Sequence, residues 1–579
     1  MTPQQTRRVP LLGTVALAIA ATLILPGAHP VVPSGPLMSV IVREYPGSSV
    51  DPGAVMAAVG GRVTNRLDII HGFSAQVPAS ALRLLPATPG VLSVTPNSRG
   101  HLLTTYDATT DTGSLRTAEQ RIGARAEWNA GYTGNGVDVA LIDSGVAPVD
   151  GLTAPGKIIN GPDFSLESPA TNLRHIDTYG HGTHMAGIIA GRDNSATAPY
   201  PGDTTDFLGA APDARIVNLK VADALGNTDV SQILAAIDWV VRHRTDHGMN
   251  IRVLNLSYGT NATQDYSVDP LAYATEVAWR DGIVVVAAAG NDGNGVGLTD
   301  PAYDPTILAV GAATAPTTTT QALAGDAVTT FSNALSTANR HADLVAPGSH
   351  VQSLRDPGSY IDQTYGSTGI IDSRFFRGSG TSQATAMVSG AAALLIQQHP
   401  GITPDQVKAL LKVTATPISG ASYAQGSGEV NLAAALAHGV PRGTQTASAS
   451  TGLGTVDGSR GTAQLVQNGV ALSGAKDIFG NTLTGAELAQ SEAGSQTALD
   501  SQWLNGTWHG TSWAGTSWEV TGQQQWLWSG AAWSDPDWSS HSWSSAGWDS
   551  HSWSDSAWAS HSWSGTGYSS HSWSRGTWT

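Results

Sequence analysis

Short, uninterrupted apolar runs recur through the middle of this chain and restrict the folds open to it. Such a continuous pattern is typical of strands buried on both faces of a parallel sheet. Helical patterns lie between the runs, around residues 233–241 and 271–279. Alternating strands and helices predict a doubly wound α/β fold, with helices on both faces and an active site at the carboxyl ends of the strands. The runs cover residues 137–142, 215–221, 252–256, 283–289 and 307–310.

The 579 residues are too many for one compact domain. Residues 38–97 predict a small α+β unit, because strand-like and helix-like segments alternate there. We expect the polar residues 98–117 to be a linker open to cleavage, and residues 118–437 to form the α/β domain. Residues 438–500, rich in Gly, Ser, Thr and Ala, predict a spacer. In the small unit, we expect strands at 39–42, 72–77 and 91–94 and helices at 54–59 and 80–85.

The N-terminus, residues 1–30, has the features of a secretory signal peptide. Arg7 and Arg8 precede a mainly apolar stretch over residues 11–25. Since that stretch is shorter than the roughly 20 residues of a membrane span, an uncleaved anchor is the less favoured alternative. We therefore expect a secreted, extracellular protein.

Cysteine is absent, which excludes disulfides, thiolate metal sites and a cysteine nucleophile. The net charge is −16 and no basic patch stands out, so we expect no nucleic-acid partner.

Three motifs carry the residue types of nucleophilic catalysis. VDVALIDSG places Asp143 at the end of an apolar strand, GHGTHMAGIIAG places His181 at the start of a helix, and GSGTSQATAMVSG does the same for Ser382. A serine hydroxyl is a poor nucleophile until an imidazole accepts its proton, and the imidazole needs a buried carboxylate to fix its tautomer. The pattern predicts a catalytic triad.

The motifs and their Asp, His, Ser order resemble the subtilisin-like serine peptidases, or subtilases. The resemblance extends over residues 38–437 and implies a subtilisin-like fold and an endopeptidase acting on proteins or peptides. It implies that Asn291 donates to the oxyanion beside the N–H of Ser382, and it gives His184 no chemical role. It also implies a substrate-binding strand and the walls of a specificity pocket. These are formed by Ser257, Tyr258, Gly259, Ala288, Ala289 and Gly290.

By the same resemblance, residues 38–97 are an inhibitory propeptide that assists folding and is then cut off by the enzyme itself. No cofactor is required for the chemistry and no metal ligand is assigned. Members of the family commonly bind structural calcium, but the spacing around Asp300 and Asp304 is not diagnostic.

The chain departs from the family pattern in two places. The serine motif continues Gln-Ala-Thr-Ala-Met and lacks the usual proline, which we expect to straighten the helix without removing a catalytic group. Residues 349–377 form a longer stretch than usual, which predicts a lid or rim over the site.

Two other interpretations fit the motifs less well. Asp111-Thr112-Gly113 and Asp143-Ser144-Gly145 both look like aspartic-peptidase motifs, but that chemistry needs two carboxylates sharing a proton and leaves His181 unexplained. A catalytically inactive binding protein on the same fold is disfavoured because every triad residue and the oxyanion amide are present.

Residues 501–579 form a repeat in which tryptophan recurs every five residues from Trp503 to Trp578, except at Gln523 and Tyr568. This period fits neither a helix nor a flat strand. Evenly spaced aromatic rings predict contact with a cell wall or another surface, and a stalk or solubilising tail is the alternative. Four His-Ser-Trp units within the repeat are more typical of repeat composition than of metal binding.

Overall fold

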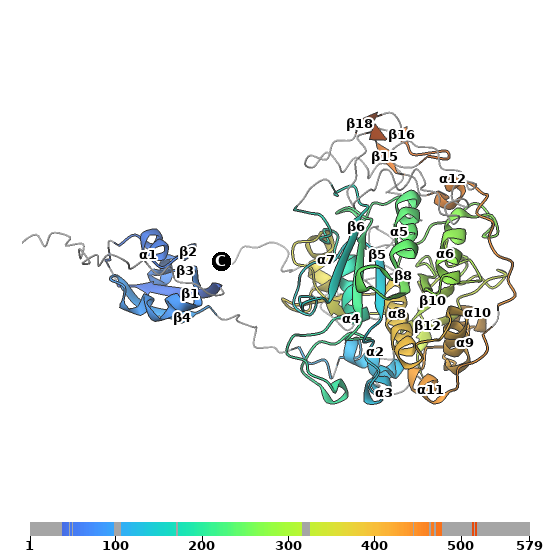
Figure 1. Ribbon diagram of the computed structural model, residues 1–579, viewed down its shortest axis with the longest axis horizontal. Helices are drawn as coiled ribbons and strands as arrows, with labels where there is room; N and C mark the ends of the chain where they lie inside the picture. The colour runs from blue at the N-terminus through green and yellow to red at the C-terminus, as the bar shows by residue number, and fades with distance from the viewer. Residues whose placement is uncertain are drawn as a thin grey trace, which may run out of the picture. The chain divides into compact units, whose positions relative to one another are not determined.

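The computed structural model describes residues 37–97 and 106–476 apart from short gaps at 46, 49, 110, 169–171, 315–324, 444, 463–464 and 468–469, together with the backbone of 512–513 and 516–517. The chain divides into two compact units, residues 1–105 and 106–579 (Figure 1). The predicted signal peptide and most of the tryptophan repeat lie outside the described residues.

The first unit is a four-stranded antiparallel sheet in the order β2-β3-β1-β4. Its strands are β1 (Leu37–Glu44), β2 (Arg62–Leu67), β3 (Gly72–Pro78) and β4 (Val91–Pro96), with helix α1 (Pro52–Ala58). Val40, Val42, Met56 and Phe73 are buried in its core.

The sequence missed β2 because this strand is largely exposed on both faces and so has no apolar side. The predicted helix at 80–85 is instead two short 3-10 helices, Ala79–Arg83 and Leu85–Ala87. Pro86 has no backbone N–H and cannot donate the hydrogen bond of a continuing α-helix, in keeping with the short 3-10 turns.

The second unit is built on one eight-stranded sheet in the order β11-β10-β9-β8-β5-β7-β6, with β12 also paired to β10. All pairs are parallel except β10 with β11. The five predicted strands are confirmed, and β6, β11 and β12 are additional. The strands are β5 (Asp138–Asp143), β6 (Ile158–Asp163), β7 (Arg215–Lys220), β8 (Ile251–Leu256), β9 (Val284–Ala288), β10 (Leu308–Thr314), β11 (Ala327–Val328) and β12 (Leu344–Pro347).

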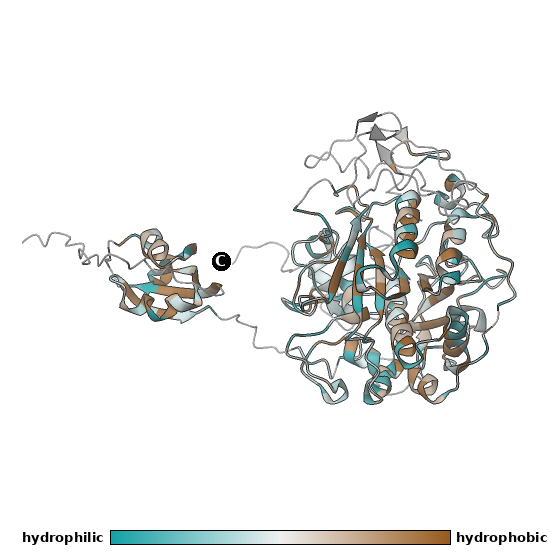
Figure 2. Cartoon of the chain, in the orientation of Figure 1, coloured by the Kyte–Doolittle hydropathy of each residue, from teal (hydrophilic) through white to brown (hydrophobic). Residues whose placement is uncertain are grey.

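Helices α4 and α8 pack on each other and on the sheet, and α5 and α6 form a second such pair. Every residue of β5 is buried, so both faces of the sheet are covered, as a doubly wound fold requires. Hydrophobic residues concentrate on the strands (Figure 2). The helices are α2 (Leu115–Ile122), α3 (Ala124–Asn129), α4 (His181–Ala190), α5 (Val230–His243), α6 (Pro270–Arg280), α7 (Tyr360–Gly369), α8 (Thr381–Gln398), α9 (Pro404–Thr414), α10 (Ser422–Gln425), α11 (Leu432–Ala437) and α12 (Val456–Arg460).

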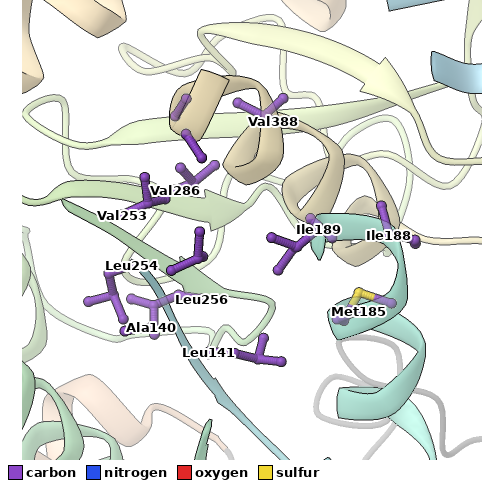
Figure 3. Packing of buried hydrophobic residues seen from close by; sticks show 14 of the residues in the cluster. Ala140, Leu141, Met185, Ile188, Ile189, Val253, Leu254, Leu256, Val286 and Val388 are labelled. Carbon is purple, nitrogen blue, oxygen red and sulfur yellow. The ribbon is translucent and has the colours of Figure 1, made fainter. Parts of the chain in front are cut away.

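The core that holds α4 and α8 lies between these helices and the central strands (Figure 3). Val253 and Val286 of the sheet, Ile188 and Ile189 of α4, and Val388 of α8 are all fully buried there. Helix α8 runs without interruption over 18 residues, in keeping with the absence of a proline in its motif. This packing fixes where the first residue of each helix lies.

The predicted linker at 98–117 is wrong at its C-terminal end. The Tyr106 hydroxyl donates to Asp111 and to Gln352, each at 2.9 Å, and α2 begins at Leu115. Asp111 forms an ion pair with Arg377. Residues 106–117 therefore belong to the folded second unit, apart from Thr110, which is not described.

The predicted spacer at 438–500 is wrong over its first part as well. The described residues between 438 and 476 belong to the folded second unit, and Arg460 of α12 is completely buried. The long stretch 349–377 forms strands β13 (Val351–Leu354) and β14 (Phe375–Gly378), which pair with each other and flank α7. Two further short strand pairs are β15 (Val466–Gln467) with β16 (Val470–Ala471) and β17 (Ser512–Trp513) with β18 (Thr516–Ser517).

No helix in the described part of the chain is long and apolar enough to cross a membrane.

Candidate active site

A carboxylate and an imidazole meet at the carboxyl end of the central strand. Asp143 is the last residue of β5 and His181 the first of α4. His181 Nδ1 lies 2.7 Å from Asp143 Oδ1 and 2.9 Å from Oδ2, and both residues are buried. A Cβ at Gly182 would lie only 2.1 Å from the Gly145 carbonyl oxygen, so only glycine lets α4 approach the strand this closely.

Asp177, which the sequence did not single out, holds this pair in place. Its Oδ1 accepts from the Ser144 hydroxyl at 2.8 Å, and its Oδ2 accepts from both the N–H and the hydroxyl of Thr183 at 2.7 Å. Burial raises the pKa of Asp177 above its usual value. Asp177 ties the residue after Asp143 to the first turn of the His181 helix. Nothing in the sequence distinguishes it from an acid in a solvated turn.

The serine motif meets the predicted oxyanion amide. The Thr381 N–H and hydroxyl donate to Asn291 Oδ1 at 2.8 and 3.0 Å, so the amide nitrogen of Asn291 faces the other way. A Cβ at Gly380 would lie 3.5 Å from Asn291 Nδ2 and 3.7 Å from the Ser382 nitrogen. Two nitrogen donors therefore border the space beside Gly380, together with the side-chain oxygen of Gln383, which would lie 2.8 Å from the same Cβ position.

A cavity of about 40 Å³ lies beside the Asp–His pair. Ser257 connects it to the serine motif, because its hydroxyl donates to the Ser382 carbonyl at 3.3 Å. The lining includes Asp143, Tyr179, His181, Val221, Gly226, Thr228, Ser257, Tyr258 and Gly259.

The other predicted wall of the pocket lies next to the oxyanion amide. Ala288 ends β9, and the Gly290 N–H donates to the Thr381 hydroxyl at 3.3 Å. Neither Ala288, Ala289 nor Gly290 lines the 40 Å³ cavity. The six predicted substrate-binding residues thus form two groups, one beside His181 and one beside Asn291.

Helix α7 of the long stretch lies against the segment that leads into His181. The ring of Tyr360 stacks on Tyr179 with centroids 5.9 Å apart, and the Tyr360 N–H donates to the Thr178 carbonyl at 3.1 Å. Tyr179 lines the cavity, so this stretch supports one side of it.

The alternative assignments find no support in the geometry. Asp111 is paired with Arg377 while Asp143 contacts His181, so the two carboxylates do not share a proton. His184 is buried within α4, and burial lowers its pKa to about 3, which keeps it neutral.

The described residues include no group of three or more acidic or histidine side chains arranged to hold a metal ion. Asp300 and Asp304 are buried, and burial raises the pKa of both, to about 7 for Asp304.

A largely parallel α/β sheet with a buried carboxylate–imidazole pair, and a serine motif packed beside the Asn291 amide, is the arrangement expected of a serine-type hydrolase. Residues 134–430 match the model of the subtilase family (Peptidase_S8), and the chain belongs to this family of serine-type endopeptidases. Family members need no cofactor for catalysis.

Among similar proteins, serine protease AprX of Bacillus subtilis (strain 168) is 36% identical over 286 residues, which are 48% of this chain and 61% of AprX. Subtilisin E of the same strain is 31% identical over 393 residues, 67% of this chain and 86% of subtilisin E. The crystal structure of a cold-adapted subtilisin-like serine proteinase is 28% identical, covers 52% of this chain and 90% of its own, and has a TM-score of 0.38.

Proposed function

We propose that this chain is a secreted endopeptidase that cleaves peptide bonds through a covalent acyl-enzyme, with Asp143, His181 and Ser382 as its triad. The observation that carries the proposal is the buried contact of 2.7 Å between His181 Nδ1 and Asp143. It is supported by the packing of α4, which begins with His181, on α8, which begins one residue before Ser382.

In this mechanism the Ser382 hydroxyl attacks the peptide carbonyl while His181 Nε2 takes its proton and later delivers it to the leaving amine. Asp143 keeps the other ring proton on Nδ1 and stabilises the imidazolium. Asn291 Nδ2 and the Ser382 N–H stabilise the oxyanion. Water then repeats the sequence and releases the acyl group.

Ser257, Tyr258 and Gly259 are proposed to pair with an extended substrate backbone. Because β8 ends at Leu256, this segment lies at the carboxyl edge of the sheet beside His181. Ala288, Ala289 and Gly290 are proposed to complete the pocket for an apolar side chain.

Labelling with a fluorophosphonate tests the triad directly. We expect a stoichiometric adduct on Ser382 in the mature protein, located by mass spectrometry of its peptides. A folded protein that hydrolyses no peptide and forms no adduct would favour an inactive binding protein on the same fold.

Asn291→Ala is expected to lower kcat by about 10²–10³-fold with little change in KM, the size of effect known for the oxyanion asparagine of subtilisin. The interaction is lost mainly in the transition state, where the oxygen carries charge. Steady-state kinetics on one peptide substrate will measure it. A rise in KM with unchanged kcat would contradict an oxyanion role.

We further propose that residues 1–30 direct export and that residues 38–97 are an inhibitory propeptide that the enzyme removes itself. Since Tyr106 and Asp111 are bonded within the second unit, the cleavage is proposed between residues 98 and 105 rather than later. Mass spectrometry of the mature N-terminus will locate it.

The tryptophan repeat, residues 501–579, is proposed to hold the enzyme to a cell wall or another surface. Deleting these residues is expected to leave kcat/KM for peptides unchanged and to move the enzyme from the cell fraction to the medium. Unchanged fractionation after the deletion would rule out anchoring and favour a stalk or solubilising tail.

A further inference from the structure

Residues 450–476, here called the strap, lie beyond the part of the chain that matches the family model. The strap runs along residues 260–269, the segment that directly follows Ser257–Tyr258–Gly259. The Thr263 N–H donates to the Gly458 carbonyl at 2.8 Å, and the Gly454 N–H to the Val268 carbonyl at 2.6 Å. Helix α12 of the strap contacts α5 and α6 (Figure 1).

Glycine is required where the strap meets this segment. A Cβ at Gly461, where φ is +60°, would lie 1.8 Å from the Asn261 carbonyl oxygen, and one at Gly458 would lie 2.3 Å from Gln264 Oε1. The glycine-rich composition therefore serves close packing here, whereas the sequence alone suggested a loose spacer.

One buried ion pair joins the strap to the start of α5. Arg460 Nε and Nη2 lie 2.7 and 3.1 Å from the two carboxylate oxygens of Asp229, and both side chains are excluded from solvent. Asp229 is the N-cap of α5 and forms a capping box with Gln232. Arg460 also donates hydrogen bonds to the backbone carbonyls of Gly474 and Lys476. These bonds hold the C-terminal end of the strap against Arg460.

Through Asp229, Arg460 supports one wall of the cavity beside His181. Thr228, which lines the cavity, directly precedes Asp229. Gln232 Nε2 donates to the carbonyl of Val221, another lining residue, at 3.1 Å. Displacing the start of α5 would therefore displace this wall.

The strap also supports the opposite wall. The Thr260 hydroxyl, one residue after Gly259, donates to the Ser459 carbonyl. The Gln264 side chain forms two hydrogen bonds with the backbone of Thr455. Its Nε2 donates to the Thr455 carbonyl at 2.9 Å, and its Oε1 accepts from the Thr455 N–H at 3.0 Å.

We propose that the strap is a positioning element of the substrate-binding pocket, in which Arg460 and its neighbours hold the Val221–Thr228 wall and the Ser257–Gly259 wall at a fixed separation. Arg460 touches no substrate and acts through Asp229 and Ser459. The inference rests on the proposed substrate-binding role of Ser257, Tyr258 and Gly259.

The test uses a double variant, because Arg460→Met alone would leave the Asp229 carboxylate buried without its partner. In Asp229→Asn/Arg460→Met no charge is left buried at residue 229, and asparagine remains a good N-cap. Asp457, which also pairs with Arg460, has a side chain that is 34% exposed, so water can solvate its charge. The matched control is Asp326→Asn/Arg121→Met, which removes a similarly buried ion pair between α2 and the edge of β11. Thermal unfolding must show that each variant is folded at the assay temperature.

We expect the strap variant to raise KM by about tenfold for tetrapeptide nitroanilides with a large apolar side chain before the scissile bond, with kcat changed less than about twofold. The rate of Ser382 labelling by a small fluorophosphonate, which does not fill the pocket, should stay at the wild-type value. The control variant should keep wild-type KM despite its lower melting temperature.

Wild-type KM in the folded strap variant, or an equal rise in the control, would overturn the inference. If the strap variant does not fold, Gln264→Ala decides instead. It removes the hydrogen bonds of Gln264 to Thr455, Ser459 and Asp269 while it leaves the Arg460–Asp229 pair intact, and it is expected to raise KM in the same direction. A wild-type enzyme that forms no Ser382 adduct would refute the proposed function itself, an outcome distinct from failure of the strap.

Discussion

Replacing Ser382 by alanine is expected to lower kcat by about 10⁶-fold, the loss known for removing the catalytic serine of subtilisin. No other hydroxyl can then form the acyl-enzyme, and only binding and the oxyanion donors remain. Active-site titration and peptide hydrolysis will measure the loss. If the enzyme processes itself, the variant should also accumulate with its N-terminal unit attached, which an immunoblot will detect.

Ser389→Ala provides a matched control on the same helix. The Ser389 hydroxyl donates to Asn255 Oδ1 at 2.9 Å within the core, away from the Asp–His pair. Its removal is expected to cost about 1–3 kcal/mol of stability and to leave kcat within a few-fold of wild type. Equal losses of activity in the two variants would indicate damage to α8 rather than loss of a nucleophile.

Asp143→Asn is expected to reduce kcat by about 10⁴-fold while the protein stays folded. The Ser144 N–H donates to Oδ1 at 2.8 Å, which favours placing the amide oxygen there and the amide NH₂ at the position of Oδ2. That NH₂ would lie about 3 Å from His181 Nδ1 and favour the tautomer with its proton on Nε2. The imidazole could then no longer accept the serine proton.

Asp138→Asn, at the opposite end of the same strand, is the control for Asp143→Asn. It distinguishes a loss of catalysis from a loss of stability. Asp138 is buried and pairs with Arg215 at 2.6 Å, so its substitution should lower the melting temperature. Because it lies at the amino end of β5, kcat should remain near wild type. A loss of 10⁴-fold in both variants would argue against a special role for Asp143.

The central strands and the two catalytic helices could be predicted because their signals are local. A continuous apolar run needs burial on both faces, and Gly180 and Gly380 mark the residues before α4 and α8. Strand β6 was missed because its last residues, Asn-Gly-Pro-Asp, interrupt the apolar pattern. The proximity of Asp143 and His181 followed from their both lying at the carboxyl edge of one sheet.

The supporting residues could not be predicted because their partners are distant in the sequence. Arg460 and Asp229 are separated by 231 residues, and nothing near either one indicates an ion pair. The supporting role of Asp177 can be recognised only in the structure, where its carboxylate accepts hydrogen bonds from Ser144 and Thr183. The strap was misread because glycine and serine are common both in loose linkers and in tightly packed contacts.

The position of Arg460 sets a practical limit for anyone who shortens this enzyme for production. The match to the family model stops at residue 430, and a boundary chosen there would remove Arg460, the cation that pairs with Asp229 in the described part of the protein. Fusion partners or purification tags are better joined after residue 476, where the last carbonyl that Arg460 contacts is retained.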